Sequence, residues 1–287
     1  MRIKFLSLTI LISILSYAQT NRALLVFIDT YPQKSGWEDI HATNDSLIII
    51  PMLFKQGYPK KNIKILSNEN ATKKNIIQYL SNIYKESVSG DYIYVHFSCH
   101  GQQMIDEDGD EIDGLDEALI PYDAKRRYTK GKYEGENHLR DDELEKYLEQ
   151  FRQKIGKNGH ITVVLDACHS GTGTRNEDED DYIRGTSYIF GSEEQLSKPI
   201  NPSSWRLSHR IDKQLSSITV FSACQEDQMN HEYKDVTTNK YYGSLSYVLS
   251  KTLSLKSNTQ SVVSFYDSLK NSMKTILGLD LGTNSIG

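Results

Sequence analysis

Residues 23–28 read ALLVFI, an uninterrupted apolar run, and two runs of similar character follow at 91–98 (DYIYVHFS) and 161–165 (ITVVL). A strand that is apolar on both faces is typical of a parallel sheet with helices on each side. Shorter apolar runs at 63–66 and 218–221 predict two further strands. The five runs together favour an α/β fold with a mostly parallel central sheet.

Helices are predicted between these strands and after the last one. Apolar residues spaced three or four apart mark the helices as amphipathic. The predicted segments are 72–87, the stretch through Leu144, Tyr147, Leu148 and Phe151, and residues 241–253 and 261–271. The stretch 40–56 is also helical in pattern, but we expect a break or a late start at Pro51, because proline lacks an amide hydrogen.

The composition excludes several classes of protein. The chain has 287 residues, a formal net charge of −5, 38% hydrophobic residues and three cysteines. The apolar content is too high for a disordered chain, and three cysteines are too few for a disulfide-dense scaffold. The acidic balance argues against a protein that binds nucleic acid by neutralising phosphates, so we expect no nucleic-acid partner.

The N-terminus has the pattern of a secretory signal peptide over residues 1–18. A short basic start, Arg2 and Lys4, precedes an apolar run that ends in the small residues of Ser16-Tyr17-Ala18. The run is shorter than the roughly 18 residues that a membrane anchor requires, so cleavage after Ala18 is favoured over anchoring. We therefore expect a secreted or periplasmic protein with no membrane span after cleavage.

Two strand ends deliver residues suited to thiol chemistry. His100-Gly101 follows the strand at 91–98, and Cys168 lies just after the strand at 161–165. In open α/β sheets, functional groups gather at the carboxyl ends of the strands. A lone cysteine is more often a core residue and a lone His-Gly is usually a turn, but a histidine and a cysteine at one edge can supply a base and a nucleophile.

These segments resemble the caspase-like cysteine peptidases, and within them the metacaspases and their bacterial relatives. The resemblance rests on HFSCHGQQ (96–103), DEDGDEIDGLDEALIPYD (106–123), VVLDACHSGTGTR (163–175) and FSACQEDQ (221–228), followed by HEY and YGSLSYVLSKTL. It spans roughly residues 22–271 of a domain that we place at 19–272. It implies a caspase-like three-layer sandwich and a cysteine endopeptidase that acts on protein or peptide substrates as a monomer.

The resemblance also implies roles for single residues. His100 would be the catalytic base and acid, Cys168 the nucleophile, and the amides of Gly101 and Cys168 the oxyanion hole. Metacaspases cleave after Arg or Lys, and the residues that match their primary specificity pocket are Asp45, Ser98 and Asp166. Without the resemblance, Asp45 could equally cap a helix and Asp166 could accept backbone hydrogen bonds.

Two residues depart from the family pattern. Cys99 stands where a glycine is usual before the histidine, and Ala42 stands where many metacaspases have a pocket cysteine. Strand alternation predicts that Cys99 points away from His100 into the core. A disulfide between Cys99 and Cys224 is conceivable after export, although we do not expect their strands to be adjacent.

An acidic block between the two motifs raises the question of calcium. Eight carboxylates fall within the twelve residues 106–117, but Glu111 replaces the glycine that an EF-hand loop requires. The resemblance implies a different calcium site at Asp116, Asp141 and Asp142. The alternative is a solvated acidic loop, with Asp141 or Asp142 capping the following helix. No organic cofactor is expected.

The stretch 172–187 is polar and charged and contains Arg175 and Arg184. It is either a plain surface loop or, if the specificity is basic, a segment that the enzyme cleaves in itself. Residues 273–287 (MKTILGLDLGTNSIG) resemble instead the start of a ribonuclease-H-like CRISPR nuclease. They could be a fusion scar, part of a truncated longer chain or a mis-called reading frame. Asp280 is expected to have no functional role, because one strand cannot assemble a metal site.

Other functions remain open at this point. A gingipain- or legumain-like relative would have the same histidine and cysteine with a different pocket. A catalytically silent calcium-binding scaffold and, from the tail alone, a nuclease subunit are further alternatives.

Overall fold

The fold is described from a computed structural model, which covers residues 19–106, 114–169, 182–197, 213–223, 230–254 and 262–277. The predicted signal peptide, Arg175, Cys224 and residues 278–287 lie outside these ranges. None of the helices within them is both long and apolar enough to cross a bilayer.

A five-stranded sheet forms the centre of the molecule, in the order β2-β1-β3-β7-β8, and all its neighbouring strands are parallel. The strands are β1 (Asn21–Phe27), β2 (Ile63–Ser67), β3 (Tyr92–Ser98), β7 (His160–Asp166) and β8 (Ser217–Ser222). All five apolar runs of the sequence are strands of this sheet, so the predicted fold class is confirmed.

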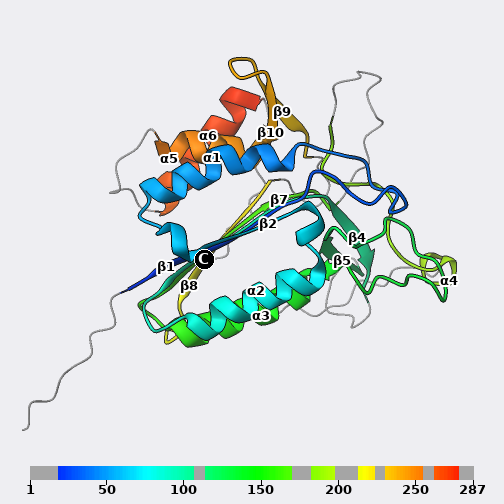
Figure 1. The fold of residues 1–287 in the computed structure, drawn as a ribbon, viewed down its shortest axis with the longest axis horizontal. Helices are drawn as coiled ribbons and strands as arrows, with labels where there is room; N and C mark the ends of the chain where they lie inside the picture. The colour runs from blue at the N-terminus through cyan, green and yellow to red at the C-terminus, as the bar shows by residue number, and fades with distance from the viewer. Residues whose placement is uncertain are drawn as a thin grey trace, which may run out of the picture.

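Helices cover both faces of the sheet (Figure 1). On one face lie α1 (Ala42–Lys55), α5 (Ser244–Ser254) and α6 (Val262–Leu277), and on the other lie α2 (Lys73–Glu86) and α3 (Asp141–Ile155). Strand β1 shows why its sequence is apolar throughout. Leu25 and Phe27 pack with α1 and α5, whereas Leu24 and Val26 belong to the cluster under α2 and α3.

Helix α1 differs from the prediction at Pro51, because it runs unbroken from Ala42 to Lys55. Proline removes one intrahelical hydrogen bond, the one to the carbonyl of Leu47. Both Pro51 and Leu47 lie on the exposed side of the helix. Water can therefore satisfy the carbonyl group, and the buried side of the helix stays intact.

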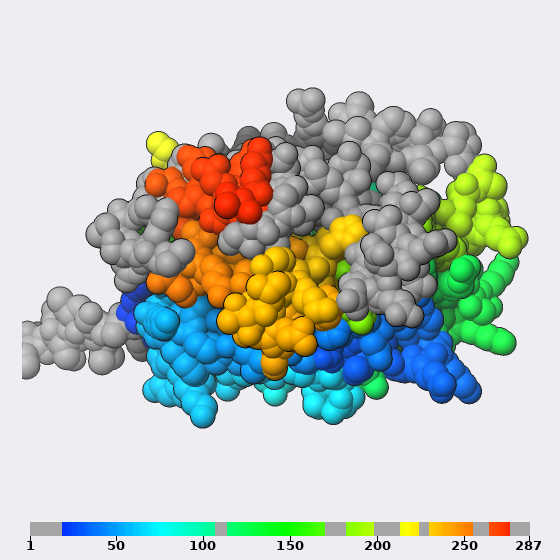
Figure 2. Space-filling view, turned by 90° about the horizontal axis from the view of Figure 1, so that it is seen from above, coloured from blue at the N-terminus to red at the C-terminus, as the bar shows by residue number. Residues whose placement is uncertain are grey.

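Two smaller sheets complete the fold and were not anticipated from the sequence. One is the antiparallel sheet of β4 (Gly101–Ile105), β5 (Leu115–Leu119) and β6 (Leu139–Arg140). The other is the hairpin of β9 (Glu232–Asp235) and β10 (Lys240–Gly243). The short helix α4 (Glu193–Leu196) and the turns η1 (Lys60–Asn62) and η2 (Asn68–Asn70) are the remaining elements. The hairpin, gold in Figure 2, lies beside α1.

The C-terminal helix extends past residue 272, where we placed the end of the domain. Helix α6 continues to Leu277, and Met273 is fully buried in the same apolar cluster as α1 and α5. Met273, the first residue of the segment 273–287, therefore packs into the core of this fold.

Candidate active site

The carboxyl ends of β3 and β7 bring the two sequence motifs together. These strands pair in register, with Ser98 opposite Asp166. His100 follows the first strand by two residues and Cys168 follows the second by two residues. Both side chains lie at the edge of the sheet where the sequence predicted them.

The His100 imidazole is held in one tautomer. Its Nε2 lies 2.9 Å from the backbone carbonyl oxygen of Glu38. Because a carbonyl oxygen can only accept, Nε2 carries the proton of the neutral ring. The other nitrogen, Nδ1, is buried and has no hydrogen-bond partner among the described residues. The neutral ring therefore presents a bare nitrogen that can take up a proton.

Aromatic side chains fix the plane of this ring. Trp37 stacks on His100 with 4.9 Å between ring centroids, and Tyr31 packs at 5.4 Å. The Tyr31 hydroxyl also accepts a hydrogen bond from the His100 amide, at 3.2 Å. Burial lowers the pKa of His100 to about 4, opposed by its hydrogen bond to Glu38. The imidazole is thus neutral at physiological pH in this state, as a base must be.

Two backbone amides converge on one carbonyl oxygen next to Cys168. The amide of Cys168 donates to the carbonyl oxygen of Arg184 at 2.8 Å, and the amide of Gly101 donates to it at 3.3 Å. These are the two amides predicted to form an oxyanion hole. Gly101 must lack a side chain, because a Cβ there would lie 2.7 Å from the Cys168 carbonyl oxygen and 2.8 Å from the His169 ring.

The side chain of Arg184 fills a buried pocket that contains all three residues predicted for substrate recognition. Its Nη1 donates to Asp45 at 2.9 Å and to the Ser98 hydroxyl at 2.5 Å, and lies 3.7 Å from Asp166. All four side chains are fully buried. We call this the arginine pocket and define it by Asp45, Ser98, Asp166 and Glu232.

Glu232, at the start of β9, is the pocket residue that sequence reasoning missed. Both Nε and Nη2 of Arg184 donate to its Oε1, at 3.0 and 2.8 Å. Burial alone would raise the pKa of Glu232, but Arg184 and hydrogen bonds from His41 lower it below its ordinary value. The sequence signal for it is the HEY motif at 231–233, which by itself assigns no role to the glutamate.

Hydrogen bonds hold the two aspartates of the pocket in place. Asp45 accepts from the Ser98 hydroxyl at 2.5 Å and from the Gly243 amide at 2.9 Å. Asp166 accepts from the amide and hydroxyl of Ser246 and from the Asn230 side chain, at 2.5–2.8 Å. Burial raises the pKa of Asp45 to about 6; Arg184 opposes this rise and Asp166 adds to it.

The chain around Arg184 pairs with the chain before β9 through an isolated bridge at Ile183 and then bends at Arg184 and Gly185. Its residues 182–184 pair antiparallel with 230–232, through the Arg184 amide to Asn230 and the Glu232 amide to Tyr182. Beyond Arg184, a Cβ on Gly185 would overlap the Cys168 carbonyl oxygen and lie 3.1 Å from the Cys168 Cβ. We call residues 182–190 the docked segment. Cys168 is completely buried.

The docked segment is also held on the far side of Gly185. Arg126 donates two hydrogen bonds to the Thr186 hydroxyl, at 2.9 and 3.2 Å. Gln102 donates to the carbonyl oxygen of Tyr188 at 2.8 Å, and Phe190 pairs with Gln103 through its amide. The segment is therefore held along its length, from Tyr182 beside β9 to Phe190 beside β4.

The remaining cysteines are accounted for in part. Cys99 is buried in the core cluster beneath α2 and α3, as strand alternation predicted, and burial raises its pKa to about 12. Neither Cys99 nor Cys168 forms a disulfide. Strand β7 separates β3 from β8, so the strands that precede Cys99 and Cys224 are not neighbours, as expected.

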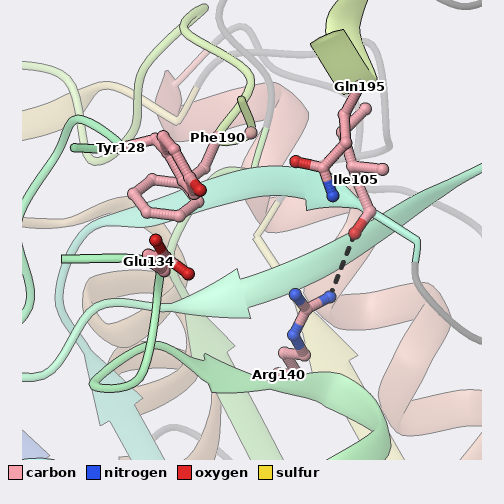
Figure 3. A pocket seen from close by; sticks show the side chains of 7 residues that line it. Ile105, Tyr128, Glu134, Arg140, Phe190 and Gln195 are labelled. Carbon is pink, nitrogen blue, oxygen red and sulfur yellow. Dashed lines mark hydrogen bonds between the residues drawn. The ribbon is translucent and has the colours of Figure 1, made fainter. Parts of the chain in front are cut away.

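The residues predicted to bind calcium lie on β5 and α3, and neither of these elements contributes a residue to the arginine pocket. Asp116 is buried and ion-paired with Arg140, which also donates to the Ile105 carbonyl at 3.2 Å (Figure 3). Desolvation, with Glu117 and Asp142 nearby, raises the pKa of Asp141 to about 7, although the residue as a whole is exposed and solvent will moderate this. Over the described ranges, no three acidic, histidine or cysteine side chains are grouped to hold a metal.

Arg140 also borders a small hollow on this side of the molecule. The hollow has a volume of about 120 Å³ and is lined by Ile105, Tyr128, Glu134, Arg140, Phe190, Gly191 and Gln195 (Figure 3). Neither His100, Cys168 nor any residue of the arginine pocket lines it.

Comparison with known proteins places this geometry in context. A family model described as "Metacaspase, peptidase C14 domain" matches residues 21–175, more than half of the chain. Metacaspase-1A of Aspergillus oryzae is 30% identical over 160 residues, which cover 53% of this chain and 35% of that protein. Metacaspase-1 of Plasmodium falciparum is 26% identical over 261 residues, 87% of this chain and 37% of that protein. The alignments thus span about a third of the length of these curated relatives.

A solved structure supports the fold independently. Protein GSU0716 from Geobacter sulfurreducens superposes with a TM-score of 0.59 over 88% of each chain, at 19% sequence identity. At this identity the likeness concerns the fold alone.

Proposed function

This chain belongs to the metacaspase family of cysteine-type endopeptidases, and we propose that it hydrolyses peptide bonds on the carboxyl side of arginine, using Cys168 and His100. The observation that carries the proposal is the docked segment. Its Arg184 has the side chain in a pocket of carboxylates and the carbonyl oxygen between two amides beside Cys168. A peptide substrate would need the same two placements.

The chemistry follows from the hydrogen bonds of the site. His100 Nδ1 takes the proton of the Cys168 thiol, while Nε2–H stays bound to the Glu38 carbonyl. The thiolate attacks the carbonyl carbon of the arginine, and the amides of Gly101 and Cys168 hold the oxyanion. His100 then returns the proton to the leaving amine as the C–N bond breaks. Water hydrolyses the thioester, with His100 acting again as the base.

The pocket favours arginine over other side chains. Three buried carboxylates face one cation, so an acidic or amide side chain would leave them uncompensated. The acceptors also match the fork of a guanidinium, because Glu232 takes two of its N–H groups and Asp45 takes a third. Lysine supplies the charge without this fork, so we propose cleavage after both residues, with arginine preferred.

We propose that the docked segment is itself a substrate and that the chain cleaves itself between Arg184 and Gly185. Gly185 suits the position after the bond, because a larger residue would overlap the backbone of Cys168. Arg175, the other arginine considered for self-cleavage, lies outside the described residues. Until it is cleaved, the segment would cover Cys168 and exclude other substrates.

A peptide panel tests the activity. Fluorogenic peptides that end in Arg, Lys, Asn or Asp are incubated with the purified full chain and with Cys168→Ala. We expect the fluorophore to be released from Arg peptides in a Cys168-dependent reaction, more slowly from Lys peptides, and not at all from Asn or Asp peptides. Cys99→Ala is the matched control, since it removes the other described buried thiol, and it should retain activity. Hydrolysis after Asn would indicate a legumain-like relative, and no Cys168-dependent hydrolysis would indicate a silent scaffold.

We carry export and calcium stimulation as separate proposals. Export after cleavage at Ala18 rests on residues 1–18 and is tested by N-terminal sequencing of the exported protein. For calcium, the described side chains fit only in part, because Asp116 is engaged by Arg140 while Asp141 lies near Glu117 and Asp142. No catalytic step depends on the ion. A monomer is proposed as well, with size-exclusion chromatography as its test.

A further inference from the structure

We propose that the rings of His41 and Tyr241 form a subsite that selects an aromatic residue two positions before the cleaved arginine. This inference rests on the proposed function and specifies the class of peptide that the same site would take. We call the two rings the aromatic clamp. In the structure it holds Tyr182, the residue two positions before Arg184.

The contacts between the clamp and Tyr182 are close and have favourable geometry. The Tyr182 ring meets His41 edge-on, with 4.4 Å between centroids and planes at 89°, and meets Tyr241 at 4.9 Å and 65°. Perpendicular and strongly tilted ring pairs at such distances are favourable beyond the area that they bury. A side chain without a ring would forfeit both contacts.

Groups other than Tyr182 also hold the two rings of the clamp. His41 stacks on Tyr241 with centroids 4.9 Å apart. Glu232 fixes His41 through two hydrogen bonds. The backbone amide of His41 donates to Oε1 of Glu232 at 2.9 Å, and Nδ1 of the His41 ring lies 2.7 Å from Oε2. The ammonium of Lys234 lies 4.9 Å from the centre of the Tyr241 ring, and Asn44 donates to the Tyr241 carbonyl. Rings held in place by such contacts lose little entropy on binding, which favours selectivity.

Backbone pairing delivers the aromatic residue to the clamp. The Tyr182 carbonyl accepts from the Glu232 amide at 2.8 Å, and the Arg184 amide donates to the Asn230 carbonyl at 3.0 Å. These bonds use no side chain of the substrate, so any extended peptide can make them. Once an arginine fills its pocket, the register of this pairing places the residue two positions earlier against His41 and Tyr241.

Glu232 links the clamp to the arginine pocket. Its Oε1 accepts from Arg184, while its Oε2 binds the His41 ring. An arginine that orients Glu232 therefore also orients one wall of the clamp. The two subsites should favour a sequence of the form aromatic-x-Arg, as in Tyr182-Ile183-Arg184.

The test compares two peptides on one enzyme. Acetyl-Tyr-Ile-Arg and acetyl-Ala-Ile-Arg, each coupled to aminomethylcoumarin, are assayed with the full chain, Tyr241→Ala and Tyr241→Phe. We expect kcat/KM for the tyrosine peptide to exceed that for the alanine peptide about tenfold in the parent. The ratio should fall to about one in Tyr241→Ala and persist in Tyr241→Phe. Both peptides are assayed on the same protein sample. A fraction of molecules that is misfolded or blocked by the docked segment therefore lowers both rates equally and does not change their ratio.

The outcomes separate the inference from the function on which it rests. Cleavage of both peptides with a ratio near one in the parent, or a ratio that survives Tyr241→Ala, overturns the clamp and leaves the peptidase proposal standing. No Cys168-dependent cleavage of either peptide overturns both. The rate of self-cleavage after Arg184 provides a second test in the full chain. Tyr182→Ala should slow self-cleavage about tenfold, and Tyr182→Phe should not slow it. Equal rates for the two variants would contradict the clamp.

Discussion

Arg140 and Arg184 both neutralise buried carboxylates, and they differ in the segment that carries them. Arg140 extends from the end of β6 and pairs with Asp116 on β5, within one small sheet. Arg184 belongs to the docked segment and fills the arginine pocket, whose residues come from α1, β3, β7 and β9. Only Arg184 has its carbonyl oxygen between the amides of Gly101 and Cys168. The same ion-pair chemistry thus forms a structural contact at one site and a substrate-like contact at the other.

The largest difference should appear when each arginine is removed. Arg184→Ala is expected to reduce self-cleavage at this position at least about 100-fold, because the bond loses the side chain that holds it beside Cys168. Arg140→Ala should change the rate of self-cleavage by no more than about twofold. It should instead lower the free energy of unfolding by about 1–3 kcal/mol, since Asp116 stays buried without its partner. Gel electrophoresis over time and thermal denaturation measure the two effects. A loss of cleavage in both variants would abolish the distinction.

Substitutions of the carboxylates should sharpen the same contrast. Glu232→Gln is expected to lower kcat/KM for arginine peptides about 10- to 100-fold and for lysine peptides less, because it weakens two guanidinium hydrogen bonds that lysine cannot make. Asp116→Asn is the matched change at the Arg140 ion pair. It should alter kcat/KM for arginine and for lysine peptides by no more than about twofold. Steady-state kinetics on both peptides decide this, and an equal loss for arginine and lysine would contradict the role given to Glu232.

The pH dependence of kcat/KM should follow the ionisation of Asp45 in the arginine pocket and not that of the base, His100. Asp45, with a pKa of about 6, is protonated at lower pH and then no longer pairs with a guanidinium. Burial beneath a bound chain lowers the pKa of His100 to about 4, so the ring of the covered site stays neutral through that range. For arginine peptides we therefore expect kcat/KM to fall about tenfold between pH 7 and pH 5, mainly through KM. Asp45→Asn should abolish this fall of kcat/KM at low pH. A fall that persists in the variant would show that another group titrates.

Sequence predicted the parts of the site that lie at strand ends and missed those that depend on tertiary docking. His100 and Cys168 could be placed because buried parallel strands must end at one edge, whereas Ser98 was placed by the family resemblance. Glu232 could not, since β9 is a four-residue strand with no apolar run to mark it. The pocket position of Arg184 depends on 182–184 pairing with 230–232, which no local pattern encodes.

The fold shows the same division. The five buried strands were identifiable from their continuous apolar runs, whereas β4 to β6 carry polar residues and were missed. Pro51 misled the helix prediction because the rule for proline ignores which side of the helix faces water. Exposure of Pro51 and Leu47, visible only in the folded chain, explains the intact helix α1.

Calcium should produce the smallest effect and concerns the region around Asp116 and Asp141. We expect chelation to lower peptide hydrolysis about two- to fivefold and added calcium to restore it, because a cation would offset the repulsion that Glu117 and Asp142 exert on Asp141. Asp141→Asn should make the rate insensitive to both treatments. Equal rates with chelator and with calcium in the parent protein would end this proposal without affecting the arginine pocket.

The most direct test of the account is the identity of the new terminus formed by the full chain. The purified parent and Cys168→Ala proteins are incubated side by side, and the fragments are sequenced from their N-termini. The docked segment predicts one new terminus at Gly185 in the parent and none in the variant. An uncut parent, a cut at the same place in Cys168→Ala, or a terminus at another residue would contradict the proposal that Arg184 is bound as a substrate.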